Sequence, residues 1–400
     1  MQSSDEYTVP AGIGDRLVPL LLIVGLFFFN IFARSVLSPL LLPMEEEFSI
    51  SHAASSRFFL YISAGYALTI ILSGFVSHAL MHRRTIFLSS FLASFGLLVI
   101  GFAPGLPMVH LGLVIIGCGA GLFPPSSISM ITEMIKRSDW QKALAVNELG
   151  PHLAMLAVPL YAAALLPYGD WRVIIVSAGV LMMVLTLLSM RLIRVGNNRG
   201  EPPKITHIAA LIHLPAFWIM ILLFGLGLSS IQGVYLLIPS YLVTEGGFTL
   251  SQANTIFGIS RVVPIAALMS AGLVIDSIGI RRGIGITIFL AGASIVLVGL
   301  LEGIPLIIMI FLQPAAGALF FPAGIAAVSL IGPSRTRNVA FSMLLPLASF
   351  LGTGAIPAFI GYMGEHASFR IGFIAAGAVT CLSSFLAVFL KIEEKPGKTE

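Results

Sequence analysis

The side chains best able to do chemistry in this sequence are two arginines, Arg34 and Arg261, which lie inside long apolar stretches. A charged side chain at membrane depth is costly and by default faces the interior of a helix bundle. Asn30 precedes Arg34 by one helical turn, so the two share a face. The chain neighbours of Arg261 are apolar, so its charge needs a substrate anion, a glutamate on another helix, or water. Both arginines are therefore candidates to bind an anionic substrate, the alternative for Arg34 being a side chain that snorkels to the outer interface.

A second group lies in the stretch NELGPHLAMLAVP, where Glu148 and His152 are one helical turn apart on the same face. Histidine titrates near neutrality, and a desolvated glutamate titrates closer to neutrality than an exposed one. The pair is therefore a candidate proton-coupling site, and His152 is also a candidate substrate ligand. The alternative is a structural pair near the inner end of the helix, because Lys142 lies close by in the chain.

Other polar side chains in apolar stretches are candidates to line a substrate cavity, or else to form interhelical hydrogen bonds and interfacial anchors: Tyr61, Tyr66, Gln232, Tyr235, Tyr241 and Gln313. The acidic run 45–47 is expected to be a solvated outer loop. Both cysteines, Cys118 and Cys381, lie in apolar runs, so neither a disulfide framework nor a cysteine metal site is expected. With no nucleophile, metal cluster or nucleotide loop, we expect no cofactor and no enzymatic activity.

The composition identifies the elements that must position these residues. Hydrophobic residues make up 57% of the chain and charged residues 10%, whereas soluble chains carry about 25% charged residues. We therefore predict an all-α integral membrane protein with twelve transmembrane helices, each long enough to cross a hydrocarbon core of about 30 Å. The predicted spans are 17–42, 55–80, 85–104, 106–135, 141–166, 171–194, 214–244, 252–276, 283–302, 304–332, 337–363 and 368–390.

An internal repeat divides these helices into two sets of six. A shift of 198 residues superposes Arg83-Arg84 on Arg281-Arg282 and Trp171-Arg172 on Phe369-Arg370. Because each half has six spans, both halves start on the same side, which makes the repeat parallel and typical of transporters. The polar, proline-rich stretch between the halves is predicted to be a linker. The expected domains are an N-terminal six-helix bundle, 1–194, a cytoplasmic linker, 195–210, and a C-terminal six-helix bundle, 211–400.

The loops after the second helix of each half carry a recognisable motif, G-x-x-x-D-[RK]-x-G-[RK]-R. The second half matches it at Gly272, Asp276, Gly279 and Arg281, and the first half keeps Gly74 and Arg83 with His78 in place of the acid. With this motif and the repeat, the sequence resembles the major facilitator superfamily over essentially its full length. The resemblance implies two six-helix bundles that rock around a central site, with these seven residues acting in gating.

The distribution of lysine and arginine predicts the orientation. With the N-terminus inside, 17 of the 22 basic residues fall on the cytoplasmic side, as the positive-inside rule requires. Both termini are therefore expected to be cytoplasmic, in a multi-pass protein of the cell (inner or plasma) membrane. Topology explains the excess of positive charge, so no nucleic-acid partner is expected.

Together these features favour a secondary active transporter that moves a small organic anion, a carboxylate or a phosphate ester, by alternating access and by proton-coupled symport. The expected partners are that small-molecule substrate, protons and the lipid bilayer, with the chain acting as a monomer. One alternative is proton-driven efflux of cationic or amphipathic compounds, with Glu148 as the cation or proton site. A second alternative is a membrane sensor or lipid-handling protein without concentrative transport.

The topology predicts which loops a membrane-impermeant reagent reaches. Single cysteines introduced by Asn198→Cys and Glu365→Cys should react in opposite ways in intact cells, because the first lies in the predicted cytoplasmic linker and the second in a predicted outer loop. Glu365→Cys should be labelled from outside and Asn198→Cys only after the membrane is permeabilised. Labelling of Asn198→Cys in intact cells would contradict the orientation.

Overall fold

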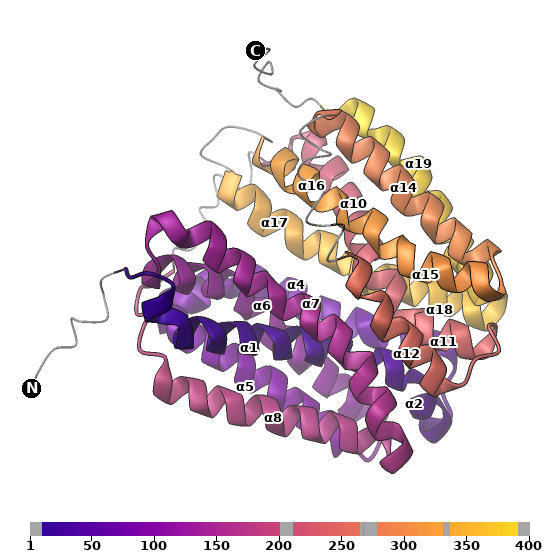
Figure 1. The fold of residues 1–400 in the computed structure, drawn as a ribbon, viewed down its shortest axis with the longest axis horizontal. Helices are drawn as coiled ribbons and strands as arrows, with labels where there is room; N and C mark the ends of the chain where they lie inside the picture. The colour runs from indigo at the N-terminus through magenta and orange to yellow at the C-terminus, as the bar shows by residue number, and fades with distance from the viewer. Residues whose placement is uncertain (1–9, 201–210, 265–266, 268–277, 331–336, 391–400) are drawn as a thin grey trace, which may run out of the picture. The chain divides into compact units, whose positions relative to one another are not determined.

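A computed structural model describes residues 10–200, 211–264, 267, 278–330 and 337–390 of the chain (Figure 1). The described residues are almost entirely helical, and eleven helical stretches are long and apolar enough to cross a membrane. These stretches match eleven of the predicted spans. The remaining one, 252–276, is described only in part. The helix α12 (Leu250–Ser260) begins two residues before it and covers its first part, whereas 265–266 and 268–276 are outside the described residues. The predicted all-α membrane fold is confirmed.

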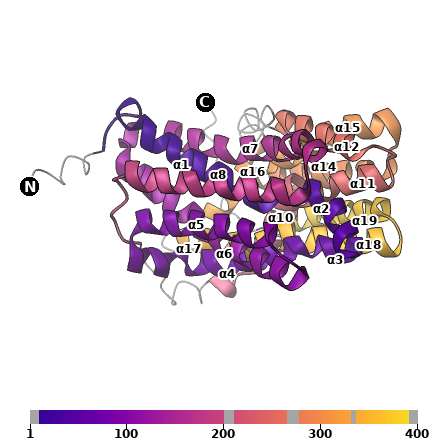
Figure 2. The ribbon, with the colours of Figure 1, turned by 90° about the horizontal axis from the view of Figure 1, so that it is seen from below.

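The chain divides into two compact units, residues 1–49 with 61–202, and residues 50–60 with 203–400. The main helices of the first unit are α1 (Leu17–Ser35), α2 (Leu41–Phe48), α4 (Phe58–Leu80), α5 (His82–Gly101), α6 (Leu106–Met134), α7 (Trp140–Leu165) and α8 (Trp171–Leu192). Within this unit α1, α5 and α8 lie side by side along a common direction (Figure 2). The glycines on their packed faces allow this close approach, because lipid-embedded helices associate by packing rather than by a hydrophobic driving force.

The second unit begins with the short helix α3 (His52–Ser56), which packs on α18. Its other helices are α10 (Pro215–Leu228), α11 (Ile238–Thr244), α12 (Leu250–Ser260), α14 (Ile280–Leu300), α15 (Gly303–Ala318), α16 (Phe320–Ser329), α17 (Arg337–Ser349), α18 (Ile356–His366) and α19 (Phe369–Ser383). Two of the described spans of this unit contain a π-helical turn. A π-helical turn, Ser229–Gly233, and a 3-10 turn, Val234–Leu237, separate α10 from α11, and a second π-helical turn, Phe350–Ala355, separates α17 from α18.

The predicted repeat is present in atomic contacts as well as in residue types. In the first unit Arg83 donates a hydrogen bond from Nη2 to the carbonyl oxygen of Met190, over 3.1 Å. In the second unit Arg281 donates from Nη2 to the carbonyl oxygen of Val388. Both residues of the second pair are 198 positions beyond those of the first. In each unit the arginine thus satisfies backbone carbonyls near the end of the last span, where a helix leaves its carbonyl groups without intrahelical partners.

Candidate functional site

Arg261 is the most deeply enclosed charge among the predicted site residues, with 4% of its surface exposed. It directly follows α12, a helix that begins with a capping box formed by Thr249 and Gln252. Its guanidinium carbon lies 3.6 Å from the centroid of the Tyr235 ring and 5.1 Å from that of Phe257. Phe257 is one helical turn before Arg261 on the same face. The two rings therefore hold the guanidinium group in a fixed orientation by cation–π contact.

The backbone next to Arg261 belongs to the interrupted span between α10 and α11. Arg261 donates from Nη1 to the carbonyl oxygen of Ile231, over 2.7 Å. Gln313 on α15 donates from Nε2 to the carbonyl oxygen of the preceding residue, Ser230, over 2.9 Å, and to its hydroxyl over 2.8 Å. Irregular backbone at membrane depth is tolerated where protein groups or a water-filled cavity satisfy it. Side chains from two neighbouring segments thus stabilise adjacent carbonyl groups of the π-helical turn. Such π-helical turns are frequent at functional sites.

Four polar side chains lie around Arg261 or in the π-helical turn of the second unit: Tyr235, Gln313, Asn254 and Gln232. Tyr235 is buried and donates its hydroxyl to the carbonyl oxygen of Ile310. Gln313 is 1% exposed, and its Oε1 has no hydrogen-bond partner among the described residues. Asn254 lies two turns before Arg261 and is fully buried, and within the same described part of the chain neither of its amide atoms is paired. Buried polar atoms normally have a hydrogen-bond partner, from protein, water or a ligand. Gln232, also predicted, is half-buried in the π-helical turn.

The first unit contains a related pair. The guanidinium carbon of Arg34 lies 4.2 Å from the ring centroid of Tyr66. Here the arginine lies on the first span and the tyrosine on the second, whereas in the second unit the tyrosine lies on the first span and the arginine on the second. Asn30 is fully buried one turn before Arg34, and neither of its amide atoms has a hydrogen-bond partner among the residues described. Arg34 is half-buried, with its guanidinium group over the Tyr66 ring.

Glu148 and His152 lie on the face of α7 that does not pack on α1. The buried stripe of α7 includes Asn147, Gly150 and Ala154, and a Cβ atom on Gly150 would lie 2.8 Å from a backbone oxygen of α1. Glu148 is exposed and His152 half-exposed on the other side of the helix. Nδ1 of His152 lies 2.8 Å from the backbone carbonyl oxygen of Glu148. The imidazole therefore contacts the Glu148 backbone.

The remaining predicted residues fall in different places. Tyr61 is exposed and its ring contacts that of His110 in a tilted arrangement, with centroids 4.7 Å apart, while Tyr66 on the same helix faces Arg34. Gly272 and Asp276 lie outside the described residues. Gly279 has φ +86°, a left-handed conformation that favours glycine, and Met81 occupies the equivalent position of the first unit at φ +72°.

The first copy of the motif contacts the described part of the predicted linker, residues 195–200. Nδ1 of His78 lies 3.0 Å from the carbonyl oxygen of Gly200, which sits close to Gly74 and Ser77. The backbone amide of Arg83 donates to the carbonyl oxygen of Gly196, over 2.8 Å. Where the motif has an acidic residue, this chain thus has His78, whose ring lies at hydrogen-bond distance from the Gly200 carbonyl oxygen.

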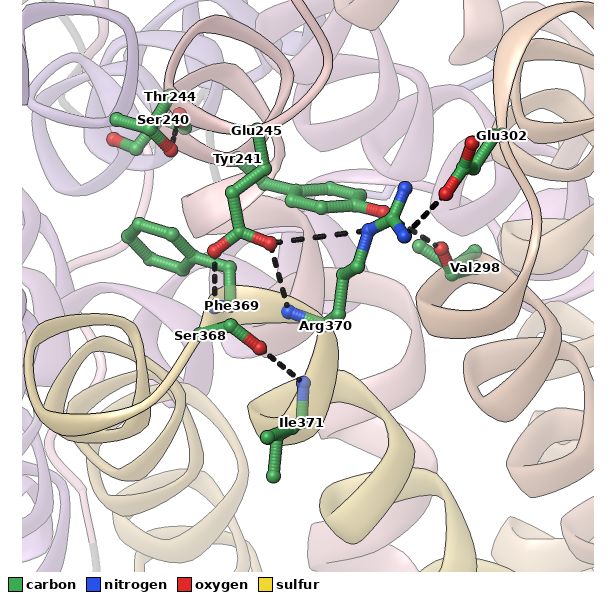
Figure 3. Close-up of polar contacts among 10 residues, drawn as sticks. All are labelled: Ser240, Tyr241, Thr244, Glu245, Val298, Glu302, Ser368, Phe369, Arg370 and Ile371. Atoms are coloured by element: carbon green, nitrogen blue, oxygen red, sulfur yellow. Dashed lines mark hydrogen bonds and ion pairs between the residues drawn. The ribbon is translucent and has the colours of Figure 1, made fainter.

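Sequence reasoning missed an ion pair in the first unit and two ion pairs that share one arginine in the second. Glu47 accepts hydrogen bonds from Arg172 and from the Trp171 indole, both over 2.6 Å, so the expectation that the run 45–47 is a solvated loop was wrong. In the second unit Glu245 lies 4.0 Å from Arg370, which also pairs with Glu302 (Figure 3). The shift of 198 relates these pairs, so aligning the acidic residues as well as the arginines would have found them.

Glu245 also stabilises the start of α19. Its carboxylate accepts the backbone amides of Phe369, over 2.5 Å, and of Arg370, over 3.3 Å (Figure 3). A carboxylate is favourable at this end of a helix because the first amide groups are unpaired and the helix dipole is positive there. The cluster therefore ties the ends of two spans together and leaves little of its charge for a substrate.

Comparison with known proteins gives a family match over nearly the whole chain. A family model described as Major Facilitator Superfamily matches residues 23–267 and 232–400. No curated protein matches the sequence.

Several solved structures share the fold at low sequence identity. One is a bacterial homologue of the human lysosomal transporter Spinster, in an inward-facing and unoccupied conformation, with a TM-score of 0.80, 17% identity, and 98% of this chain and 100% of that chain covered. Another is a POT family transporter in complex with 5-aminolevulinic acid, with a TM-score of 0.78, 13% identity, and coverage of 92% and 95%. A third is a POT peptide transporter in complex with sulfate, with a TM-score of 0.78, 14% identity, and coverage of 97% and 98%.

Proposed function

The chain belongs to the major facilitator superfamily and is a multi-pass membrane transporter rather than an enzyme, and within that family we propose that it moves a small organic anion together with a proton. The observation that carries this proposal is the position of Arg261. A permanent positive charge stands at membrane depth beside an interrupted helix, stacked on Tyr235. Such charges mark substrate pathways by default.

The stacking of Arg261 supports an anion that accepts two parallel hydrogen bonds. The guanidinium group is planar and matches a carboxylate or a phosphate with a two-bond fork, and stacking on Tyr235 fixes that plane in advance. The amide atoms of Asn254 and Gln313 that have no partner among the described residues offer neutral hydrogen bonds for the rest of the substrate. Arg34, with Asn30, offers the same chemistry in the first unit. The neighbours crystallised with sulfate and with 5-aminolevulinic acid illustrate that proteins of this fold bind such groups.

The proposed proton site is Glu148 with His152. The two lie one turn apart on the unpacked face of α7, where the carboxylate is accessible to protons. Protonation of this carboxylate in one orientation of the carrier and its release in the other would couple proton movement to substrate movement. The same exposed carboxylate also favours the second candidate function, efflux of cationic compounds, in which Glu148 binds the cation or the proton.

Organisation and orientation complete the proposal. We propose that the bundles 1–194 and 211–400, joined by a cytoplasmic linker at 195–210, rock about the substrate by alternating access in a monomer with both termini cytoplasmic. The plasma or inner membrane is the proposed location. The gating residues would act at the loops after α4 and before α14, where Arg83 and Arg281 already contact the last span of each unit.

Replacement of Arg261 should separate the anion from the cation transporter. With purified protein and a panel of carboxylates and phosphate esters, Arg261→Lys should lose part of the affinity because a point charge keeps the attraction without the planar fork. Arg261→Ala should lose at least about 2 kcal/mol, more than tenfold in Kd. Binding titrations of the wild type and both variants measure this.

Melting of the unliganded proteins provides the control for a structural role. A structural arginine would lower the melting temperature on replacement while leaving the affinity of the folded fraction unchanged, since contacts such as those with Ile231, Tyr235 and Phe257 would be lost. Equal affinities of wild type and Arg261→Ala would exclude an anion site at this residue and favour cation efflux.

Replacement of Glu148 tests proton coupling. Glu148→Gln should abolish uptake driven by a proton gradient in proteoliposomes while leaving substrate exchange largely intact, because exchange does not need the empty carrier to release its proton. His152→Gln should shift the pH optimum of uptake. Glu46→Gln, which removes an exposed carboxylate elsewhere, serves as the matched control. Unchanged gradient-driven uptake in Glu148→Gln would exclude proton coupling at this residue and assign it a structural role.

A further inference from the structure

A groove on the second unit combines apolar walls with a basic end. It lies between the first half of α14 and the 3-10 turn Ser384–Phe389, and its volume is about 650 Å³. Arg281 and Arg282 stand at one end, and Gly285, Phe289, Phe385 and Val388 are among the residues along its length. Among the described residues that line it, none is acidic. The groove is separate from Arg261 and from the proposed proton site.

The two arginines at the basic end differ in how they are engaged. Arg281 is fixed in place, because Nε donates to the carbonyl oxygen of Ala387 over 3.2 Å and Nη2 donates to that of Val388. Arg282 is exposed and makes no hydrogen bond or ion pair with any residue in the part of the chain that the structure describes. At this end of the groove, the guanidinium group of Arg281 is held by backbone carbonyl oxygens and that of Arg282 is exposed. Guanidinium groups are suited to bind phosphate oxygens.

The walls of the groove have the length and exposure of a lipid-facing surface. Phe289, Phe385 and Val388 are 48%, 64% and 60% exposed, although they lie on membrane-spanning segments. From Arg281 to Leu290 the helix rises about 14 Å, at about 1.5 Å per residue. That is about half of a hydrocarbon core of about 30 Å. The groove therefore runs from the basic interface to about the depth that one leaflet's acyl chains reach.

The repeat explains how the groove arises. Position 285 is glycine, and a Cβ atom there would meet only ordinary contacts, 3.5 Å from the Ala387 side chain. The equivalent residue of the first unit is Phe87, which is 7% exposed and lies under the guanidinium group of Arg83, 5.8 Å from it. In the first unit an aromatic ring fills the position that glycine leaves open in the second.

We propose that this groove binds one anionic phospholipid, with its phosphate at Arg281 and Arg282 and one acyl chain along Gly285 and Phe289. Basic pockets between transmembrane helices are suited to anionic headgroups, and apolar walls at leaflet depth are suited to acyl chains. The lipid would belong to the leaflet on the side of Arg281, the cytoplasmic leaflet by the distribution of basic residues. This site does not depend on which substrate the transporter moves.

Native mass spectrometry of the delipidated full-length protein tests the site. The protein is titrated with phosphatidylglycerol, with phosphatidylcholine of the same acyl chains, and with glycerol 3-phosphate. One phosphatidylglycerol should bind at least tenfold more tightly than phosphatidylcholine, because only its headgroup carries a net negative charge. Glycerol 3-phosphate should bind at least tenfold more weakly than phosphatidylglycerol, because it lacks acyl chains. Equal binding of the two lipids, or glycerol 3-phosphate as tight as phosphatidylglycerol, would overturn the proposal.

Matched variants locate the binding in the groove. Arg282→Gln removes the available charge, and Gly285→Phe introduces the side chain that the first unit has at this position. Each should weaken phosphatidylglycerol binding at least tenfold. Arg84→Gln, the equivalent arginine of the first unit, and Gly285→Ala, which adds only an unstrained Cβ, should bind as the wild type does.

The melting temperature of each variant without lipid shows that it is folded. If Gly285→Phe melts far below the wild type, Arg282→Gln alone decides, since that side chain is exposed and its loss leaves packing intact. Wild-type binding by Arg282→Gln, or an equal loss in Arg84→Gln, would refute a lipid site in this groove.

Discussion

The absence of water in the hydrocarbon core is the constraint on which the rest of this structure depends. Every backbone group at that depth must find its partner within the protein. Long uninterrupted helices meet the requirement within themselves, and their ends meet it through side chains, as Arg83 and Arg281 do at the last span of each unit. Where the regular hydrogen bonding of a span is interrupted, the backbone groups that lose their helical partners must be hydrogen-bonded by another part of the chain. An interruption therefore points to the side chains that supply those bonds.

The interruption between α10 and α11 is held by the side chains that also form the proposed anion site. Arg261 and Gln313 come from different segments and donate to adjacent carbonyl groups of the π-helical turn. Gly233 of this turn packs against the second π-helical turn at Gly352, where a Cβ atom would lie 1.9 Å from the carbonyl oxygen. Two irregular turns thus meet at a contact that only glycine permits. The arrangement stabilises the broken helix and places a charge, aromatic rings and unpaired amides together.

The fold was predictable from the sequence because hydropathy, helix length and the repeat can all be recognised from the order of residues along the chain. The candidate site was predictable only in part. Arg261, Tyr235 and Gln313 were each identified as polar residues in apolar stretches, but spacing along the chain does not reveal that they meet at the irregular turns between α10 and α11. The pairs of Glu47 with Arg172 and of Glu245 with Arg370 join residues more than a hundred positions apart, so no local pattern indicates them. The groove at Gly285 exists because glycine stands where the first unit has the aromatic side chain of Phe87, and this difference is found only by comparing the two units.

The direction of proton movement during transport tests the central claim most directly. Proteoliposomes that contain a trapped pH indicator, with no imposed gradient, are given membrane-impermeant phosphate esters, tricarboxylates or cationic compounds from outside. Anion symport predicts acidification of the lumen on addition of an anion, absent from protein-free liposomes and from Arg261→Ala. Alkalinisation of the lumen by cations, with no response to any anion, would contradict the account.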